Sequence, residues 1–284
     1  MTDTDEAVDE ILDAVVQAAP QVRAGLWERR GSEIDIDHPT GDAVIGADVF
    51  ADEVFFDHLT DLSVVGAYAS EDREEAVDLA DGFAVTVDPL DGSSNVASNN
   101  LVGSIIGVYD GELPAGGDAM VAAAYLVYGP ITTMVVAVDD TVTELAVTEA
   151  GARRLRRDVT LPSDPVVYGF GGKDPDWTPA FATFAAEIRD ELKLRYGGAM
   201  IGDVNQVLSY GGMFAYPALR DTPEGKLRLQ FEAIPMGYII ETAGGASSDG
   251  THSLLDIDPE GLHDRTPVYL GNERLIDRLE DALG

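Results

Sequence analysis

The sequence predicts an α/β or α+β chain in which sheets and helices pack in layers. With 45% hydrophobic residues among 284, the chain can bury a large core. The first half contains several short β-branched runs separated by turn residues, which is typical of strands. The second half alternates such runs with segments whose apolar residues recur at helical spacing. Strands in succession followed by strand–helix alternation therefore indicate layered sheets and helices.

The first half begins with two expected helices, residues 5–30 and 47–59, separated by a turn at Thr40-Gly41-Asp42. A strand is expected just before Glu71, and further strands are expected at 83–88, 104–109, 122–128, 132–138 and 143–147. Residues 120–138 carry no charge and are long enough to span a bilayer. Because Gly129-Pro130 divides this stretch, we expect two buried strands joined by a turn instead.

Residues 151–162 interrupt the strand pattern with four arginines and a proline. We place a domain boundary there, between an N-terminal domain (1–161) and a C-terminal α/β domain (162–284). The C-terminal domain is expected to begin with a strand at 166–170. Its expected helices are 177–192, 201–210, 232–243 and 273–283.

The composition excludes several classes of function. A net charge of −34 repels nucleic acid and anionic membranes, which need clustered basic residues. Adaptation to a salt-rich cytoplasm explains this charge better than a specific cationic partner, since salt screens self-repulsion. The chain has no cysteine, so disulfides, thiolate–zinc sites and cysteine nucleophiles are excluded. The acidic N-terminus is unlike a signal peptide, and a cytoplasmic location is expected.

Residues 87–95, VDPLDGSSN, are the candidate chemical site. The expected strand delivers Asp88 at its carboxyl end, Pro89 ends the strand, and Asp91 follows three residues after Asp88. Two carboxylates at this spacing, with the Leu90 carbonyl between them, can bind hard cations. Gly92-Ser93-Ser94 is expected to open a helix whose first amides favour a phosphate. Alone, Asp-Pro-x-Asp-Gly is also ordinary turn chemistry.

This stretch resembles the metal-dependent, lithium-sensitive sugar phosphatase superfamily, which includes inositol monophosphatases and class I fructose-1,6-bisphosphatases. Residues 195–245, from RYGGAMIGDVNQ to IIETAGG, and RTPVYLG at 265–271 resemble the fructose-1,6-bisphosphatase C-terminal core. The Trp-Asp-x-Ala-Ala-Gly element of inositol monophosphatases is absent. The resemblance covers about residues 40 to 284 and implies a layered αβαβα sugar-phosphatase fold.

The resemblance implies a metal site holding two or three Mg²⁺ ions, with Mn²⁺ as an alternative. Its ligands would be Glu71, Asp88, Asp91, Glu232 and the Leu90 carbonyl. On residue type alone, Glu71 is one acid among 52, and Glu232 is typical of a carboxylate at a helix start.

The resemblance also implies three further acids that hold a mobile loop, position a metal or prepare the attacking water, namely Asp42, Asp48 and Asp72. The family usually has glutamate at the position of Asp72. The identity of the general base is therefore open.

The resemblance implies that the 1-phosphate meets the Ser93 and Ser94 amides, beside Gly92, and Arg228. Lys226 would contact sugar oxygens or phosphate. Two residues apart on a strand, Lys226 and Arg228 would face the same side, and they are two of only 18 basic residues. This pairing indicates a binding role before any resemblance is considered.

The family's 6-phosphate pocket corresponds to Arg195, Tyr196 and Tyr216. The family takes the arginine from a neighbouring subunit, which implies a homo-oligomer, either a dimer or a tetramer. By residue type alone, tyrosines beside glycines are more typical of core or turn positions. The sequence departs from the family at Gly169-Phe170-Gly171-Gly172, where the pocket usually offers an asparagine and a tyrosine.

The expected activity is Mg²⁺-dependent hydrolysis of fructose 1,6-bisphosphate to fructose 6-phosphate and phosphate, a step of gluconeogenesis. The alternatives are phosphatases of the same superfamily acting on sedoheptulose 1,7-bisphosphate, inositol phosphate or a nucleotide 3′-phosphate. A non-catalytic metabolite-binding or scaffold protein is a third class. Residues 1–30 lack the basic nucleotide-inhibition element of animal-type members, so insensitivity to AMP is expected. The four histidines show no ligand spacing and are expected at surface or capping positions.

Overall fold

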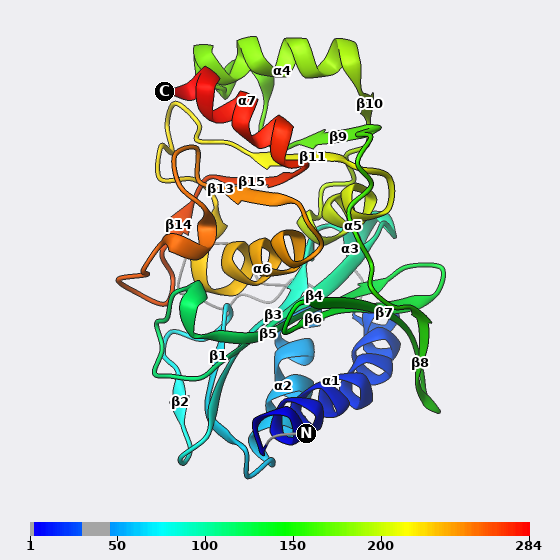
Figure 1. Ribbon diagram of the computed structural model, residues 1–284. Coiled ribbons are helices and arrows are strands. Elements are labelled where there is room, and N and C mark those ends of the chain that lie inside the picture. The colour runs from blue at the N-terminus through cyan, green and yellow to red at the C-terminus, as the bar shows by residue number, and fades with distance from the viewer. Residues whose placement is uncertain (1–2, 30–45) are drawn as a thin grey trace.

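The computed structural model describes residues 3–29 and 46–284, and within these ranges it consists of five alternating layers (Figure 1). Helices α1 (Asp3–Glu28) and α2 (Gly46–Thr60) cover one face of an eight-stranded sheet. Helices α5 (Met200–Tyr210) and α6 (Ile234–Thr242) lie between this sheet and a five-stranded one. Helices α4 (Pro179–Glu191) and α7 (Glu273–Leu283) cover the far face of the smaller sheet. The predicted αβαβα arrangement is confirmed.

The large sheet has the order β2-β1-β3-β4-β5-β6-β7-β8. Only β1 and β3 pair in parallel, while the other neighbours are antiparallel. The bounds are β1 Val65–Ser70, β2 Val77–Asp78, β3 Phe83–Asp91, β4 Val102–Tyr109, β5 Met120–Tyr128, β6 Thr132–Val138, β7 Thr141–Thr148 and β8 Gly151–Arg156. The uncharged stretch therefore forms two neighbouring strands, β5 and β6, as predicted. In the part of the chain that the structure describes, no helix could cross a membrane.

The prediction that Pro89 ends its strand is wrong. Strand β3 continues to Asp91, and its register against β4 shifts between Asp88 and Asp91. Proline is tolerated inside a strand at such a bulge, because the ladder hydrogen bond it cannot donate is not required there. The hydroxyl of Ser104 donates to the Pro89 carbonyl at 2.7 Å and satisfies it. The bulge thus keeps both aspartates on the sheet near the end of β3.

The prediction that the strand pattern stops at residue 151 is also wrong. Residues Gly151–Arg156 form β8, the edge strand beside β7, and all but the first of them are exposed. An edge strand with no buried face has no apolar alternation, and basic side chains protect such an edge from pairing with another chain. The chain leaves this sheet only after residue 156. The division into two domains at residue 161 remains a prediction.

The smaller sheet has the order β10-β9-β11-β15-β13, with a separate two-stranded pair β12-β14. The bounds are β9 Val167–Phe170, β10 Lys193–Leu194, β11 Gly212–Tyr216, β12 Leu227–Arg228, β13 Ala246–Ser248, β14 Arg265–Thr266 and β15 Val268–Gly271. Short helical turns occur at α3 (Asn95–Ser98), η1 (Gly117–Ala119), η2 (Asp174–Asp176), η3 (Leu229–Ala233) and η4 (Leu254–Asp256). Helix α4 begins with a Thr178 side chain that accepts from the Phe181 amide, a regular N-cap.

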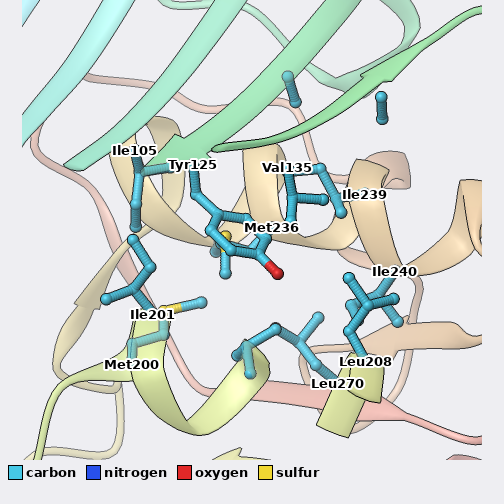
Figure 2. Packing of buried hydrophobic residues seen from close by; sticks show 14 of the residues in the cluster. Ile105, Tyr125, Val135, Met200, Ile201, Leu208, Met236, Ile239, Ile240 and Leu270 are labelled. Carbon is cyan, nitrogen blue, oxygen red and sulfur yellow. The ribbon is translucent and has the colours of Figure 1, made fainter. Parts of the chain in front are cut away.

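The core between the two sheets holds the halves of the chain together (Figure 2). The large sheet contributes Ile105, Tyr125 and Val135, and β15 contributes Leu270 from the opposite side. Between them lie side chains of α5 and α6, which are Met200, Ile201, Leu208, Met236, Ile239 and Ile240. Every one of these ten side chains is at most 4% exposed. Burial on this scale fixes how segments of the two halves meet at the site described next.

Helix α6 starts two residues later than predicted, and the segment just before it carries Glu232. Residues Leu229–Ala233 form a single π-helical turn, η3, that places Glu232 before the regular helix begins at Ile234. A π-turn widens the backbone and is frequent at functional sites. Because η3 follows directly on β12, Arg228 and Glu232 are brought close together.

Candidate active site

A cavity of about 360 Å³ lies beside the end of β3. Most residues singled out from the sequence line it, namely Asp48, Glu71, Asp72, Asp88, Leu90, Asp91, Gly92, Ser93, Ser94, Tyr196, Tyr216, Lys226, Arg228 and Glu232. Met200, Phe214, Leu227 and Gly198 complete the lining. Two predicted residues are not part of this lining. Asp42 lies outside the described residues, and Arg195 is exposed on the surface nearby.

Three carboxylates from separate segments converge in this cavity. Glu71 follows β1, Asp88 lies near the end of β3, and Glu232 lies in η3. One carboxylate oxygen from each lies within 4.8 Å of the others. Oxygen donors at this spacing suit a hard divalent cation, so the donor set fits Mg²⁺ or Mn²⁺.

Burial and mutual repulsion make the metal-free cluster costly when ionised. The pKa of Asp88 is raised well above its ordinary value, first by burial and then by the charges of Glu71, Asp91 and Glu232. Burial is also the main cause of the raised pKa of Glu232, while the Arg228 amide and guanidinium act in the opposite direction. Such carboxylates release their protons when a cation binds. The electrostatics therefore agree with the donor set.

Asp91 is held by the second half of the chain. Its Oδ2 accepts a hydrogen bond from the Ile201 amide at 2.7 Å, at the start of α5. Burial raises the pKa of Asp91 to about 6, against the lowering effect of the Ile201 and Met200 amides. The N-terminus of α5 therefore orients this carboxylate, and the bond links β3 to the C-terminal half.

Arg228 is the buried cation of the site and is only 2% exposed. Its backbone amide donates to Glu232 Oε2 at 2.5 Å, and its Nε lies 3.4 Å from Glu71 Oε1. The predicted partner Lys226 precedes β12 and is exposed, although both residues reach the same cavity. Arg228 thus balances part of the acidic cluster from within.

Ser93 and Ser94 lie between β3 and α3, which is a single turn of four residues. The prediction that Gly92-Ser93-Ser94 opens a helix is correct in position. The helix dipole of so short a turn is small, because it sums few aligned peptide groups. Any phosphate binding here would rest on individual amides and hydroxyls.

The cavity is also lined by Tyr196, Tyr216 and Lys226. The ammonium group of Lys226 lies 5.6 Å from the centre of the Tyr216 ring. The segment Gly169-Phe170-Gly171-Gly172, where the sequence departs from the family, needs glycine at position 171. A Cβ at this position would collide with the Tyr216 ring. A larger side chain there would displace Tyr216.

Comparison with known proteins places these features in a family. Residues 11–155 match the family described as fructose-1-6-bisphosphatase, N-terminal domain, and residues 161–284 match its C-terminal domain. A class 1 fructose-1,6-bisphosphatase of Natronomonas pharaonis is 57% identical over 98% of this chain and 99% of its own length. The chain belongs to the class 1 fructose-1,6-bisphosphatase family. A second relative in this family, from Halobacterium salinarum, is 55% identical over 98% of both chains.

Solved fructose-1,6-bisphosphatase structures share the fold. The Leishmania major enzyme in holo form superposes with a TM-score of 0.90 at 29% identity, covering 98% of this chain and 94% of that one. Its apo form gives a TM-score of 0.86 at 28% identity, with coverage of 98% and 93%. The family assigned from the sequence motifs is therefore confirmed.

Sequence reasoning missed several residues that shape this cavity. Asp203 is 4% exposed, and its Oδ1 accepts from the Gly197 amide at 2.6 Å, beside Tyr196. Burial raises the pKa of Asp203 to about 7. Asp203 could have been recognised from the sequence, because it is an acid on the apolar face of a predicted helix. The Ile201 amide carried no such signal, because backbone donors depend on how distant segments meet.

The histidines have no shared site among the described residues. His58 lies near Gln21 on the surface, 2.8 Å between Nε2 atoms, as expected. His263 was expected at the surface or as a cap, but it is partly buried against the Phe231 ring. His38 lies outside the described residues.

Replacing Gly92 with alanine should impair the site beyond the cost of backbone strain. Gly92 has a φ of +74°, and an added Cβ would collide with Ala199, next to the α5 amides that hold Asp91. We expect the free energy of unfolding to fall by about 1–3 kcal/mol and phosphate release to fall with it. Urea denaturation and an activity assay would measure both effects.

Gly244→Ala is the matched control, since Gly244 has a φ of +82° and no atom within 4 Å of an added Cβ. It should cost only the strain of about 1 kcal/mol and leave activity unchanged. Equal losses of activity in the two variants would show that the collision of the added Cβ at position 92 with Ala199 has no effect of its own.

Proposed function

We propose that this chain hydrolyses the 1-phosphate of fructose 1,6-bisphosphate in a Mg²⁺-dependent reaction, releasing fructose 6-phosphate and phosphate. The observation that carries the proposal is the convergence of Glu71, Asp88 and Glu232 from three segments within 4.8 Å, in one cavity with Ser93 and Ser94. The family's name supports the choice of substrate. A cytoplasmic role in carbohydrate metabolism forms part of the proposal.

Two or three Mg²⁺ ions would be held by Glu71, Asp88, Asp91, Glu232 and the Leu90 carbonyl, with Mn²⁺ as a substitute. When bound, the ions supply Lewis acidity that lowers the pKa of water and offsets charge on the transferred phosphoryl group. The positions of these ligands determine where the ions, and therefore the transferred phosphoryl group, can be held. The bulge in β3 and the Ile201 amide orient two of them, Asp88 and Asp91.

The remaining residues would bind substrate and accept a proton. Ser93, Ser94 and Arg228 would hold the 1-phosphate, the guanidinium offering a planar fork of donors. Asp48 and Asp72 reach the cavity from α2 and from the end of β1, and either can take the proton of the attacking water. The second phosphate would be held by Tyr196, Tyr216 and Lys226. Asp42, which lies outside the described residues, would hold a mobile loop, position a metal or prepare the attacking water.

The position of Arg195 supports a homo-oligomer. Arg195 is exposed and lines a second depression rather than the acidic cavity, and its neighbour Leu194 is 57% exposed. An arginine so placed can serve the 6-phosphate pocket of an adjacent subunit. A dimer or tetramer would cover this surface and complete the site.

A substrate panel in concentrated KCl tests the proposed function. We expect phosphate release from fructose 1,6-bisphosphate with Mg²⁺ and none after chelation. Inositol monophosphate should be a poor substrate, because it lacks a second phosphate for Tyr196 and Tyr216. Sedoheptulose 1,7-bisphosphate is the close competitor, and a higher kcat/KM for it would replace the proposed substrate. Absence of Mg²⁺-dependent release from every phosphate ester would refute the proposal.

A further inference from the structure

A partly buried ion pair links α2 to the segment that carries Glu71 and Asp72. The guanidinium of Arg73 contacts Asp52 Oδ2 through both Nε and Nη2, each at 2.7 Å. The Tyr68 hydroxyl donates to the other oxygen of Asp52 at 2.9 Å. Both carboxylate oxygens of Asp52 are thereby satisfied, and Asp52 is only 6% exposed. The contact therefore has one defined geometry rather than the variable geometry of a surface pair.

Aromatic stacking restricts Arg73 further. Its guanidinium lies 4.1 Å from the centre of the Phe56 ring and 5.6 Å from that of Tyr68. These two rings contact each other edge to face at 5.3 Å. A planar guanidinium stacked on a ring and paired in a fork loses little extra freedom on binding. Arg73 is consequently a fixed attachment point between α2 and the end of β1.

The backbone of Arg73 reaches the second half of the chain. Its carbonyl oxygen lies 2.9 Å from Nε2 of His263. The ring of His263 packs on Phe231 with ring centres 5.5 Å apart. Phe231 immediately precedes Glu232 in η3. The contact chain therefore runs from α2 through Arg73 to the segment that carries Glu232.

Each segment tied together by Arg73 supplies an acid to the cavity. Helix α2 carries Asp48 one turn before Asp52, Asp72 immediately precedes Arg73, and Glu232 follows Phe231. In a metal-free cluster these acids repel one another, and an arrangement that brings them together needs external support. Arg73 gives that support from outside the cavity, since it does not line it.

We propose that Arg73 is a positioning residue whose side chain holds the acid-bearing segments of α2 and the end of β1 at metal-binding distance. The proposal rests on the proposed function, because it assumes that these acids bind divalent cations. It assigns Arg73 no contact with substrate. Its loss should therefore weaken metal binding more than it weakens substrate binding or folding.

The test compares Arg73→Met with Arg278→Met. Arg278 is a matched control, because it forms a two-point bridge to Glu191 at 2.8 Å and joins α7 to α4, at the far end of the molecule from α2 (Figure 1). Mn²⁺ binding is followed by electron paramagnetic resonance on the purified full chain, alongside the Mg²⁺ activation midpoint, the KM for the bisphosphate, and Tm. Metal-orienting partners typically change metal affinity by about 10- to 100-fold.

For Arg73→Met we expect Mn²⁺ affinity to fall about 10- to 100-fold, with KM at saturating Mg²⁺ changed less than about 2-fold. Arg278→Met should leave Mn²⁺ affinity unchanged. Asp52→Asn, which retains the shape but loses the charge, should weaken Mn²⁺ binding in the same direction, and it decides the matter if Arg73→Met does not fold. Unchanged Mn²⁺ affinity in a folded variant, or an equal loss in Arg278→Met, would overturn the proposal.

This experiment separates the two proposals. If the wild-type chain binds Mn²⁺ yet releases no phosphate from any ester, the proposed function fails while the Mn²⁺ comparison still tests Arg73. If the wild type is an active phosphatase and Arg73→Met binds Mn²⁺ as tightly, only the positioning role fails.

Discussion

Replacing Asp88 with asparagine should raise the stability of the metal-free protein while reducing phosphate release by at least about 100-fold. The first effect follows from burial, because Asp88 is 5% exposed among Glu71, Asp91 and Glu232, and its pKa is raised well above the ordinary value. The second follows from the loss of a proposed ligand, since even partners that only orient ligands change metal affinity by 10- to 100-fold. Opposite effects on stability and activity mark a residue kept for function.

The pH dependence of stability should also show that ionising these buried carboxylates destabilises the metal-free protein. A carboxyl whose folded-state pKa is raised keeps its proton in the folded chain at pH values where the unfolded chain has lost it. Stability therefore falls as pH rises from the ordinary aspartate value of about 3.9 toward the folded-state pKa, and the penalty remains above it. For Asp91, with a pKa of about 6, the window lies between these two values. The pKa of Asp88 is also raised by burial, so its contribution has the same sign.

Thermal unfolding of chelated protein across this pH range would measure both effects. Asp88→Asn should unfold at a higher temperature than wild type at pH 8, by about 2–4 °C for each kcal/mol gained in a chain of this size. Glu53→Gln, which removes an exposed charge from α2, controls for the net charge of −34. A lower Tm for Asp88→Asn than for Glu53→Gln would show that the metal-free cluster is not strained. Activity retained in Asp88→Asn would exclude Asp88 as a ligand.

Much of the fold follows from local sequence pattern. Helix α7 and strand β6 have the bounds predicted for them, and α1 and α2 agree to within two residues. Helix α7 buries one face at regular helical spacing, and β6 is a β-branched run that is buried almost throughout, so both patterns can be recognised locally. Strand β8 has no buried face to produce alternation, and β3 passes through a proline because a bulge accommodates it. Those two errors arose where tertiary context overrides local preference.

The site depends more heavily on long-range contacts. From residue type alone, the turn around Asp88 and Asp91 could be recognised, but nothing local distinguishes Glu71 from the other acids. The family resemblance supplied Glu71 and Glu232, and the structure brings both to Asp88. Arg73 and the Ile201 amide were missed, since their contacts join segments 21 and 110 residues apart. Sequence spacing contains no record of such pairs.

Replacing Arg228 with methionine should have the reverse effect of Asp88→Asn on the metal-free protein. The guanidinium is 2% exposed and lies 3.4 Å from Glu71, within the cluster whose anions repel one another. Removing it leaves buried carboxylates without their cation, and such losses are on the order of 3 kcal/mol. Methionine preserves much of the side-chain volume, so the change is chiefly electrostatic. Phosphate release should also fall sharply, because the proposed 1-phosphate ligand is lost.

A double-mutant cycle with Glu71→Gln isolates the electrostatic part, because the cost of losing Arg228 should shrink once Glu71 is neutral. Urea denaturation of chelated protein gives the four free energies of unfolding. Arg156→Met is the control, since Arg156 pairs with Glu144 across β7 and β8 with a side chain 47% exposed, and exposed pairs contribute about 0–1 kcal/mol. Additive losses in the cycle would mean that Arg228 does not stabilise the fold through its contact with Glu71. If the cost of losing Arg228 is smaller in the Glu71→Gln background, the Arg228 guanidinium offsets the charge of Glu71 in the metal-free protein. A bound metal ion would offset the same charge.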